Sequence, residues 1–150
     1  DIDGEAADDR SGSVSLSADG ETVAIGAIGN DDNGTNSGHV RVYNFVSSVW
    51  TQLGSYIDSE AGCERSGFSV SFSADGVSVA IGAYCNYGDG NSSGQVRVYK
   101  FLSNVWTQLG SDIDGEAAGD KSGMSVSLSA DGETVAIGAD YNDGNGSYSG

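Results

Sequence analysis

Apolar and polar residues alternate with a period of two in short runs along the chain, and no segment shows the periodicity of a helix. The run FSVSFS at 68–73 is typical, and it places Val70 and Phe72 on one face of a predicted strand. The tripeptide ADG then marks a tight hairpin turn, and SVAIGA follows with small residues between its apolar ones. We expect these small residues to face a closely packed neighbouring sheet.

Two more strands are predicted in each unit. A loop rich in Gly, Asn, Asp and Ser leads to HVRVYNF at 39–45 or QVRVYKF at 95–101, and a short turn leads to VWTQLGS. In the first of these strands the valines face one side, and the arginine and tyrosine face the other. Four short antiparallel strands per unit are the pattern of a propeller blade. The predicted fold class is therefore all-β, with tandem four-stranded antiparallel blades in a propeller-like array.

One sequence unit recurs nearly three times along the chain. The stretch SADGETVAIGA at 17–27 returns letter for letter at 129–139, and Trp50 and Trp106 set a period of 56 residues. A closed propeller needs about four to eight blades, so the array is incomplete within this chain. The predicted units are repeat one at 1–55, repeat two at 56–111, and a truncated repeat three, with two strands and a loop, at 112–150.

The charge of the chain argues against two classes of partner. Six basic residues face 22 acidic ones among 150, for a formal net charge of −16. Such a charge repels phosphate backbones and anionic lipids, so neither nucleic acid nor a membrane surface is an expected partner. No apolar run approaches the about 18 residues of a membrane span, so no membrane insertion is expected. The chain opens inside a repeat, and we expect it to be a processed or excised piece.

The blade pattern resembles the FG-GAP repeat family, which forms the β-propeller blades of integrin α-subunits and of many extracellular relatives. The matching letters in repeat two are SGFSV at 66–70, VAIGA at 79–83 and GQVRVY at 94–99, followed by a strand with Trp106 and Leu109. The resemblance extends in tandem over the whole chain. It implies propeller-type blades and an extracellular or cell-surface location.

Calcium is the one cofactor that the sequence suggests. Many FG-GAP members carry a calcium loop between their first two strands, but here it is reduced to SADG, whose lone aspartate cannot supply the about six to eight oxygens that calcium takes. DIDGEAAGD at 112–120 instead places carboxylates at relative positions 1, 3, 5 and 9. The alternative is a turn rich in Asp, held by local backbone hydrogen bonds. The candidate ligands are Asp112, Asp114, Glu116 and Asp120 in repeat three, and Asp1, Asp3, Glu5 and Asp9 in repeat one.

Two kinds of modification are predicted. Asn33, Asn91 and Asn145 each begin an Asn-x-Ser/Thr sequon, and all three fall in the same loop of their repeats, which favours N-linked glycans there. The alternative is chance, because that loop is rich in Asn, Ser and Gly.

Cys63 precedes the first strand of repeat two and Cys85 follows its second strand, so both lie at one end of a hairpin. We predict a disulfide and an oxidising compartment; the alternative is two free thiols.

Catalysis finds little support in the sequence. The single histidine, His39, starts a strand, and repeat two has Gln95 in its place. No nucleophilic triad can be assembled, and every pair of carboxylates recurs in a repeated loop, whereas a hydrolase needs one tuned pair. We therefore expect no enzyme.

The predicted function is that of an extracellular structural or adhesive repeat protein. The chain would be a building block whose partners are copies of itself, in a glycosylated surface fibre completed by strand addition. The alternative is a fragment of a closed FG-GAP propeller that binds a protein or carbohydrate.

Overall fold

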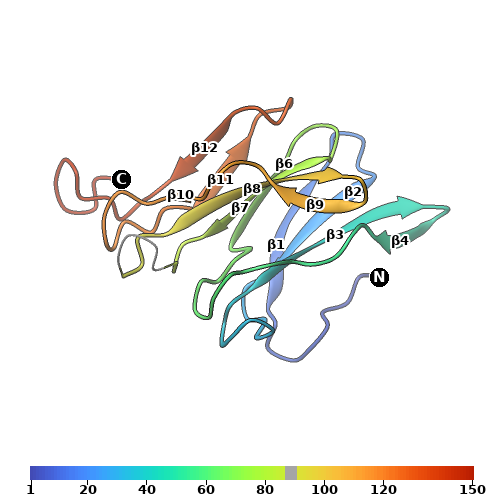
Figure 1. Ribbon diagram of the computed structural model, residues 1–150, viewed down its shortest axis with the longest axis horizontal. Helices are drawn as coiled ribbons and strands as arrows, with labels where there is room; N and C mark the ends of the chain where they lie inside the picture. Colours follow the sequence, from blue (N-terminus) through green and yellow to red (C-terminus); the bar gives the residue numbers. More distant parts are fainter. Residues whose placement is uncertain (87–90) are drawn as a thin grey trace.

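The computed structural model describes residues 1–86 and 91–150, and this part of the chain is built from strands, turns and loops. The strands form three consecutive antiparallel sheets, one per repeat, which we name blade one, blade two and blade three. The blades follow one another in chain order across the molecule, and the two termini lie at opposite ends (Figure 1). The all-β class and the antiparallel four-stranded blades predicted from the sequence are therefore confirmed.

Each blade uses the same order of strands. Blade one consists of β1 (Ser11–Leu16), β2 (Thr22–Ala27), β3 (His39–Val46) and β4 (Val49–Gln52), with the short β5 (Ile57–Asp58). Blade two consists of β6 (Ser69–Phe72), β7 (Ser78–Ala83), β8 (Gln95–Leu102) and β9 (Val105–Gln108), with the short β10 (Ile113–Asp114). Blade three holds, in the described part of the chain, β11 (Ser125–Leu128) and β12 (Val135–Gly138).

The opening residues of a repeat pair with the sheet of the repeat before it. β4 pairs with the second half of β3, and β5 pairs with its first half, where His39 lies opposite Asp58. β10 pairs with the start of β8 in the same way. The sheets of blades one and two therefore stay four strands wide. The sheets of blades one and two end at Asp58 and Asp114, past the repeat boundaries at 55 and 111.

The two faces of a blade carry side chains of different size. In blade two, Val70 pairs with Ile81, and Ser71 pairs with Ala80 in the next register position. Since paired residues share a face and successive residues alternate, the large apolar side chains lie on one face and the small ones on the other. We name these the apolar face and the small-residue face. Blades one and three have the same register and the same two faces.

The apolar face of each blade packs on the small-residue face of the blade before it. Hydrophobic burial between blades therefore holds the stack together, as in other repeat proteins. In the first core, blade one contributes Ala24, Val40 and Val42, together with Ile57 of β5. Blade two contributes Val70, Phe72, Val79, Ile81, Tyr99 and Trp106. The second combines Ala80, Val96 and Val98 of blade two with Val126, Leu128, Val135 and Ile137 of blade three.

Two glycines allow this close packing. A Cβ added to Gly26 would lie 2.0 Å from the carbonyl oxygen of Gly67, and one added to Gly82 would lie 2.2 Å from that of Gly123. Both contacts cross from one blade to the next, and neither leaves room for a side chain. The expectation that the small residues of this strand face a closely packed neighbouring sheet is confirmed.

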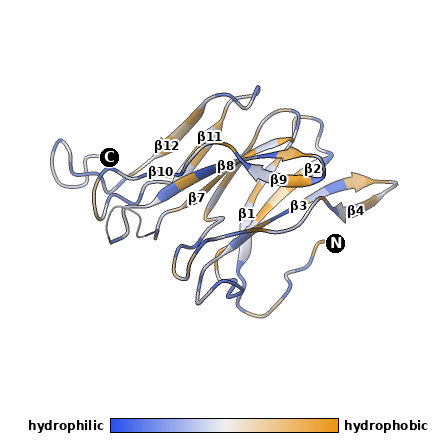
Figure 2. Ribbon diagram, in the orientation of Figure 1, coloured by the Kyte–Doolittle hydropathy of each residue, from blue (hydrophilic) through white to orange (hydrophobic). Residues whose placement is uncertain are grey.

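Polar loops gather at the blade ends, while the apolar colour lies mainly along the strands (Figure 2). The loop after the second strand of a blade touches the segment that opens the next repeat. The Cys63 amide donates to the Thr35 carbonyl at 2.8 Å, and the Gly119 amide donates to the Asn91 carbonyl at 3.0 Å. This arrangement brings the loops with the predicted glycan and cysteine residues beside the acidic segments that hold the predicted calcium ligands.

Candidate functional site

The first strand of blade one leaves its part of the apolar face uncovered in the described residues, whereas Val23 on the neighbouring β2 is buried. Val14 is 63% exposed and Leu16 is 58% exposed. Their counterparts in blade two, Val70 and Phe72, are buried at 9% and 7% because blade one covers them. The side chains on this face are of the same kind as those that form the two inter-blade cores. In the two inter-blade cores, a face of this kind packs on the small-residue face of the preceding blade.

Blade three presents the complementary surface. In the described part of the chain, β12 pairs with β11 alone, so its second edge offers unpaired backbone groups. Ser127 and Ala136 on its small-residue face are exposed. A Cβ on Gly138 would meet only atoms of Ser125, whereas the matching Gly82 meets the backbone of the next blade.

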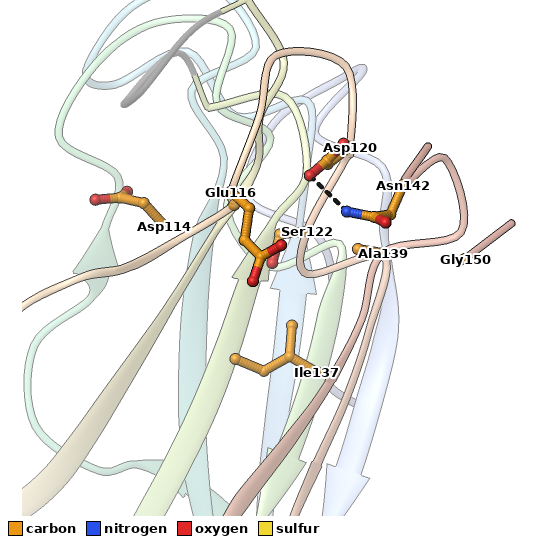
Figure 3. A pocket seen from close by; sticks show the side chains of 9 residues that line it. Asp114, Glu116, Asp120, Ser122, Ile137, Ala139, Asn142 and Gly150 are labelled. Carbon is orange, nitrogen blue, oxygen red and sulfur yellow. Dashed lines mark hydrogen bonds between the residues drawn. The ribbon is translucent and has the colours of Figure 1, made fainter. Parts of the chain in front are cut away.

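A pocket of about 350 Å³ lies beside β12 (Figure 3). The strand supplies Ile137, the acidic segment before blade three supplies Glu116 and Asp120, and the loop after β12 supplies Asn142. Asn142 Nδ2 donates to Asp120 Oδ2 at 2.9 Å, which ties the loop to the acidic segment. Asp114 also lines the pocket, which thus combines an aliphatic wall with three acidic residues.

The acidic segments form turns held by local backbone hydrogen bonds, which is the alternative to calcium that the sequence already offered. Asp9, Glu64 and Asp120 are buried, and each accepts a backbone hydrogen bond from a residue just before it in the chain. Burial raises the pKa of Glu64 above its usual value, while the nearby Arg97 guanidinium opposes that rise. Each of these carboxylates closes its own tight turn. The recurrence of an acid at this position in all three repeats was the signal for it.

The arginine of the third strand has a role that the sequence did not reveal. Arg97 is buried on β8, with Nη2 3.2 Å from Glu64 Oε2 and Nη1 3.6 Å from Glu60 Oε1. Arg41 occupies the same position on β3 and lies 3.7 Å from Glu5 Oε1. The RVY motif that repeats one and two share was the available signal.

The predicted calcium ligands do not come together as a metal centre. Among the described residues, no group of three or more His, Cys, Asp or Glu side chains is arranged to hold a metal ion. Asp3 turns its backbone carbonyl toward Arg41 Nη2, at 3.0 Å, and Glu5 accepts a hydrogen bond from the Tyr56 hydroxyl. The calcium prediction for Asp1, Asp112 and Asp114 and the other acidic positions stays a prediction without a geometric counterpart.

The three sequon asparagines are all exposed. Asn33 Nδ2 donates to the Ser59 carbonyl at 2.8 Å, so its amide is already ordered against the next repeat. Asn91 directly follows the undescribed residues 87–90, and Asn145 lies in the loop after β12. Exposure satisfies the physical requirement for a glycan, and glycosylation itself stays a prediction.

Cys63 and Cys85 are both free in the described structure, with Cys63 exposed and Cys85 half-buried. Their flanking residues nevertheless touch. Glu64 Oε1 accepts from Asn86 Nδ2 at 2.9 Å, and Arg65 hydrogen-bonds to the Tyr84 hydroxyl. The two segments therefore run beside each other as the hairpin argument requires, and the disulfide stays a prediction.

His39 is fully buried, and the surrounding charges are poorly placed to pair with it. Neither ring nitrogen has a hydrogen-bond partner among the described residues. Nε2 lies 3.7 Å from Glu5 Oε2 and Nδ1 lies 3.9 Å from Asp58 Oδ1. Burial lowers the pKa of His39, while Glu5 opposes that change. The imidazole is therefore enclosed within blade one.

Comparison with known proteins links the chain to the family that its sequence resembles. A family model described as the FG-GAP repeat matches residues 1–43, which span the opening acidic segment, β1, β2 and part of β3. The match identifies a propeller-blade type of repeat. The comparison with curated proteins found no match. In the described residues, no helix has the length and apolarity needed to cross a membrane.

Proposed function

We propose that this chain is a structural repeat protein of an extracellular or cell-surface assembly, in which neighbouring chains continue the stack of blades. One observation carries the proposal. The same interface joins blade one to blade two and blade two to blade three, and the β1 side chains of the apolar face that this interface uses are exposed on blade one.

The repeated interface is specific in its hydrogen bonds as well as in its apolar contacts. The Ala18 amide donates to the Ala74 carbonyl at 2.9 Å, and the Ala74 amide donates to the Ala130 carbonyl at 2.9 Å. Two successive interfaces with matching bonds define a fixed rotation and translation from one blade to the next. A further blade docked by the same operation extends the stack.

The exposed ends favour assembly energetically. Full burial of a side chain such as Val14 or Leu16 contributes roughly 1.5–3 kcal/mol. The two ends of the stack differ, so contacts between chains are head-to-tail, and such contacts give open filaments unless the rotation closes a ring. Glycans on Asn33, Asn91 and Asn145 would project from one end of the blades and leave the stacking faces free. The proposed assembly is therefore a glycosylated fibre.

The assembly is tested with the full chain at micromolar concentration by sedimentation velocity and negative-stain electron microscopy. We expect concentration-dependent filaments. Leu16→Glu places a charge on the apolar face and should leave monomers, whereas Val105→Glu, an equally polar change at the exposed first residue of β9, should assemble normally. A compact monomer at every concentration would overturn the proposal.

A closed propeller that binds a ligand is the second candidate. It is favoured by the arrangement of the first strands, because β6 lies against both β1 and β11, as the inner strands of a propeller do. Ring-shaped particles of one size, with no longer filaments, would favour this function. Intact mass and glycopeptide mapping of native material would test the glycans in either case.

A further inference from the structure

We propose that the outer edge strands of the blades, β4 and β9, pair antiparallel with the same edge of a second copy of this chain. Such a contact joins chains side by side, whereas the proposed stacking joins them end to end. The inference therefore goes beyond the proposed function and does not depend on it. It is drawn from blades one and two, each of which has all four strands of the repeat.

The outer edge of blade one is open. In the described residues, β4 pairs with β3 on one side and with no strand on the other. The Leu53 amide donates to the Val42 carbonyl at 2.8 Å, and this bond fixes the alternation of inward and outward residues along the strand. Thr51 therefore bonds inward to β3. Trp50 and Gln52 direct their backbone N–H and C=O groups outward.

The outer edge of blade two has the same geometry. β9 pairs with β8 alone in the described part of the chain, and the Leu109 amide donates to the Val98 carbonyl at 2.8 Å. Trp106 and Gln108 are therefore its outward residues. Both strands read VWTQ. The two open edges thus offer the same backbone groups and the same side chains.

None of the usual devices protects these edges. Natural sheets guard an open edge with a charged side chain, a proline, a bulge or a covering segment. VWTQ has no charge and no proline, and both strands keep a regular register with their neighbours. The inner edge is treated differently, because the Phe72 amide of β6 donates to Ser15 of the blade before it.

An exposed apolar pair lies at the turn end of each open edge. Val46 pairs with Val49 on the small-residue face, and Leu102 pairs with Val105. All four strands of blade two are present beside this face of blade one, yet Val49 is 60% exposed. Figure 1 shows the reason, since the β3–β4 hairpin projects from the body of the molecule. The exposure therefore persists beside a complete neighbouring blade.

The distribution of charge favours a second copy as the occupant. The chain carries a formal net charge of −16, so two copies repel each other over most of their surface. Residues 42–57 form the longest stretch without a charged side chain, and residues 101–111 have none either. Two copies can therefore approach through these hairpins with little repulsion. A cationic partner would instead be attracted to the acidic segments.

An edge of this kind is complementary to itself about a two-fold axis. With the axis beside Thr51, Trp50 of each chain exchanges backbone hydrogen bonds with Gln52 of the other. Thr51 then faces Thr51 of the second copy, and threonine pairs are favourable across strands. Thr107 has the same place between two β9 strands. Because the edge is only 4 residues long, we expect association at about 0.1–1 mM and not at micromolar concentration.

The test uses the full chain with Leu16→Glu, which removes the stacking contact, and sedimentation equilibrium from about 10 μM to about 1 mM. We expect dimers at the upper end. Thr51→Lys combined with Thr107→Lys should weaken association about ten-fold or more, because like charges then face each other, and the corresponding pair of glutamates should do the same. An equimolar mixture of the two variants should restore it. The control, Ala61→Lys with Ala117→Lys, adds the same charge at exposed turns and should associate normally.

Hydrogen exchange locates the contact. The outward amides of Trp50, Gln52, Trp106 and Gln108 should gain protection as the concentration rises, whereas the Thr51 amide is already bonded and should change little. Monomers at about 1 mM, dimers that are insensitive to the threonine substitutions, or a mixture that restores nothing would each overturn the inference. Stacking is measured at micromolar concentration in chains that retain Leu16, so the failure of one interface leaves the result for the other unchanged.

Discussion

The side-chain oxygen of Ser15 in blade one accepts a hydrogen bond from the backbone amide of Phe72 in blade two, at 3.0 Å. Ser71 and Leu128 make the same bond between blades two and three, at 2.9 Å. The amide in each case belongs to a first strand, which is the edge of its sheet. The serine therefore satisfies an edge amide that would otherwise be open to pairing with another chain.

The Ser71→Ala variant tests how much this hydrogen bond contributes to the free energy of unfolding. It leaves the partly buried Leu128 amide without its acceptor, which costs about 1–3 kcal/mol. Chemical denaturation should therefore show a lower free energy of unfolding. The matched control is Ser127→Ala, since Ser127 holds the same position on the exposed small-residue face of blade three and should change stability by less than about 0.5 kcal/mol. Equal effects of the two substitutions would contradict a role in joining blades.

Gly82→Ala and Gly138→Ala form a second matched pair. A Cβ at position 82 would meet the Gly123 carbonyl oxygen at 2.2 Å, and the backbone of blade three would have to move. We expect a loss of roughly 1–3 kcal/mol or more, as for other overpacked sites. At position 138 the nearest atom is the Ser125 hydroxyl oxygen, at the end of a short side chain that can rotate away.

Thermal unfolding followed by circular dichroism compares the two glycine variants. Gly138→Ala should unfold within a few degrees of the parent, and Gly82→Ala should unfold clearly earlier. If the Gly82→Ala protein is as stable as the parent, the close approach of the two backbones at this position contributes nothing to the free energy of unfolding.

Much of the fold was predictable because it depends on local periodicity. The alternation around Val70 and Phe72 predicts the strand and its apolar face, and the Gly and Ala positions of SVAIGA predict the closely packed face. The pairing of β5 with β3 was not predictable in this way. It joins Asp58 to His39 across a whole hairpin, and the two residues of β5 are too few to show a periodic pattern.

The candidate site was predicted by residue type but not by role. Carboxylate spacing alone does not distinguish a metal from an organic cation, so the sequence predicts calcium ligands among the acidic residues at the start of repeats one and three. The structure gives Glu64 a guanidinium partner in Arg97, 33 residues away in the chain. Such a contact depends on the register of β8, which sequence spacing does not reveal.

The buried histidine makes stability depend on pH. The pKa of His39 is lowered in the fold, chiefly by burial, so the unfolded chain binds the proton more readily than the native chain. The associated stability is fully present above the ordinary histidine pKa of about 6.5 and is lost as the pH falls through the lowered value. The free energy of unfolding should therefore fall from about pH 7.5 to about pH 5.5.

His39→Gln is the natural control for this titration, because Gln95 holds the same position in blade two. The chain has a single histidine, so the variant should be much less sensitive to pH over this range. Urea denaturation at each pH, with parent and variant side by side, measures the difference. Parallel profiles for the two proteins would show that His39 does not carry the effect.

The cysteine pair provides a test of the compartment in which the chain works. Contacts of Glu64 with Asn86 and of Arg65 with Tyr84 already hold the segments around Cys63 and Cys85 together. In an oxidising environment we expect these thiols to form a disulfide, which should add roughly 3 kcal/mol for a loop of this length. Peptide mapping of native material without reductant should recover the linked pair, and reductant should lower the unfolding midpoint of the parent but not of Cys85→Ser. Full alkylation of both thiols in unreduced native protein would contradict the prediction and remove the support that the cysteines give to an extracellular location.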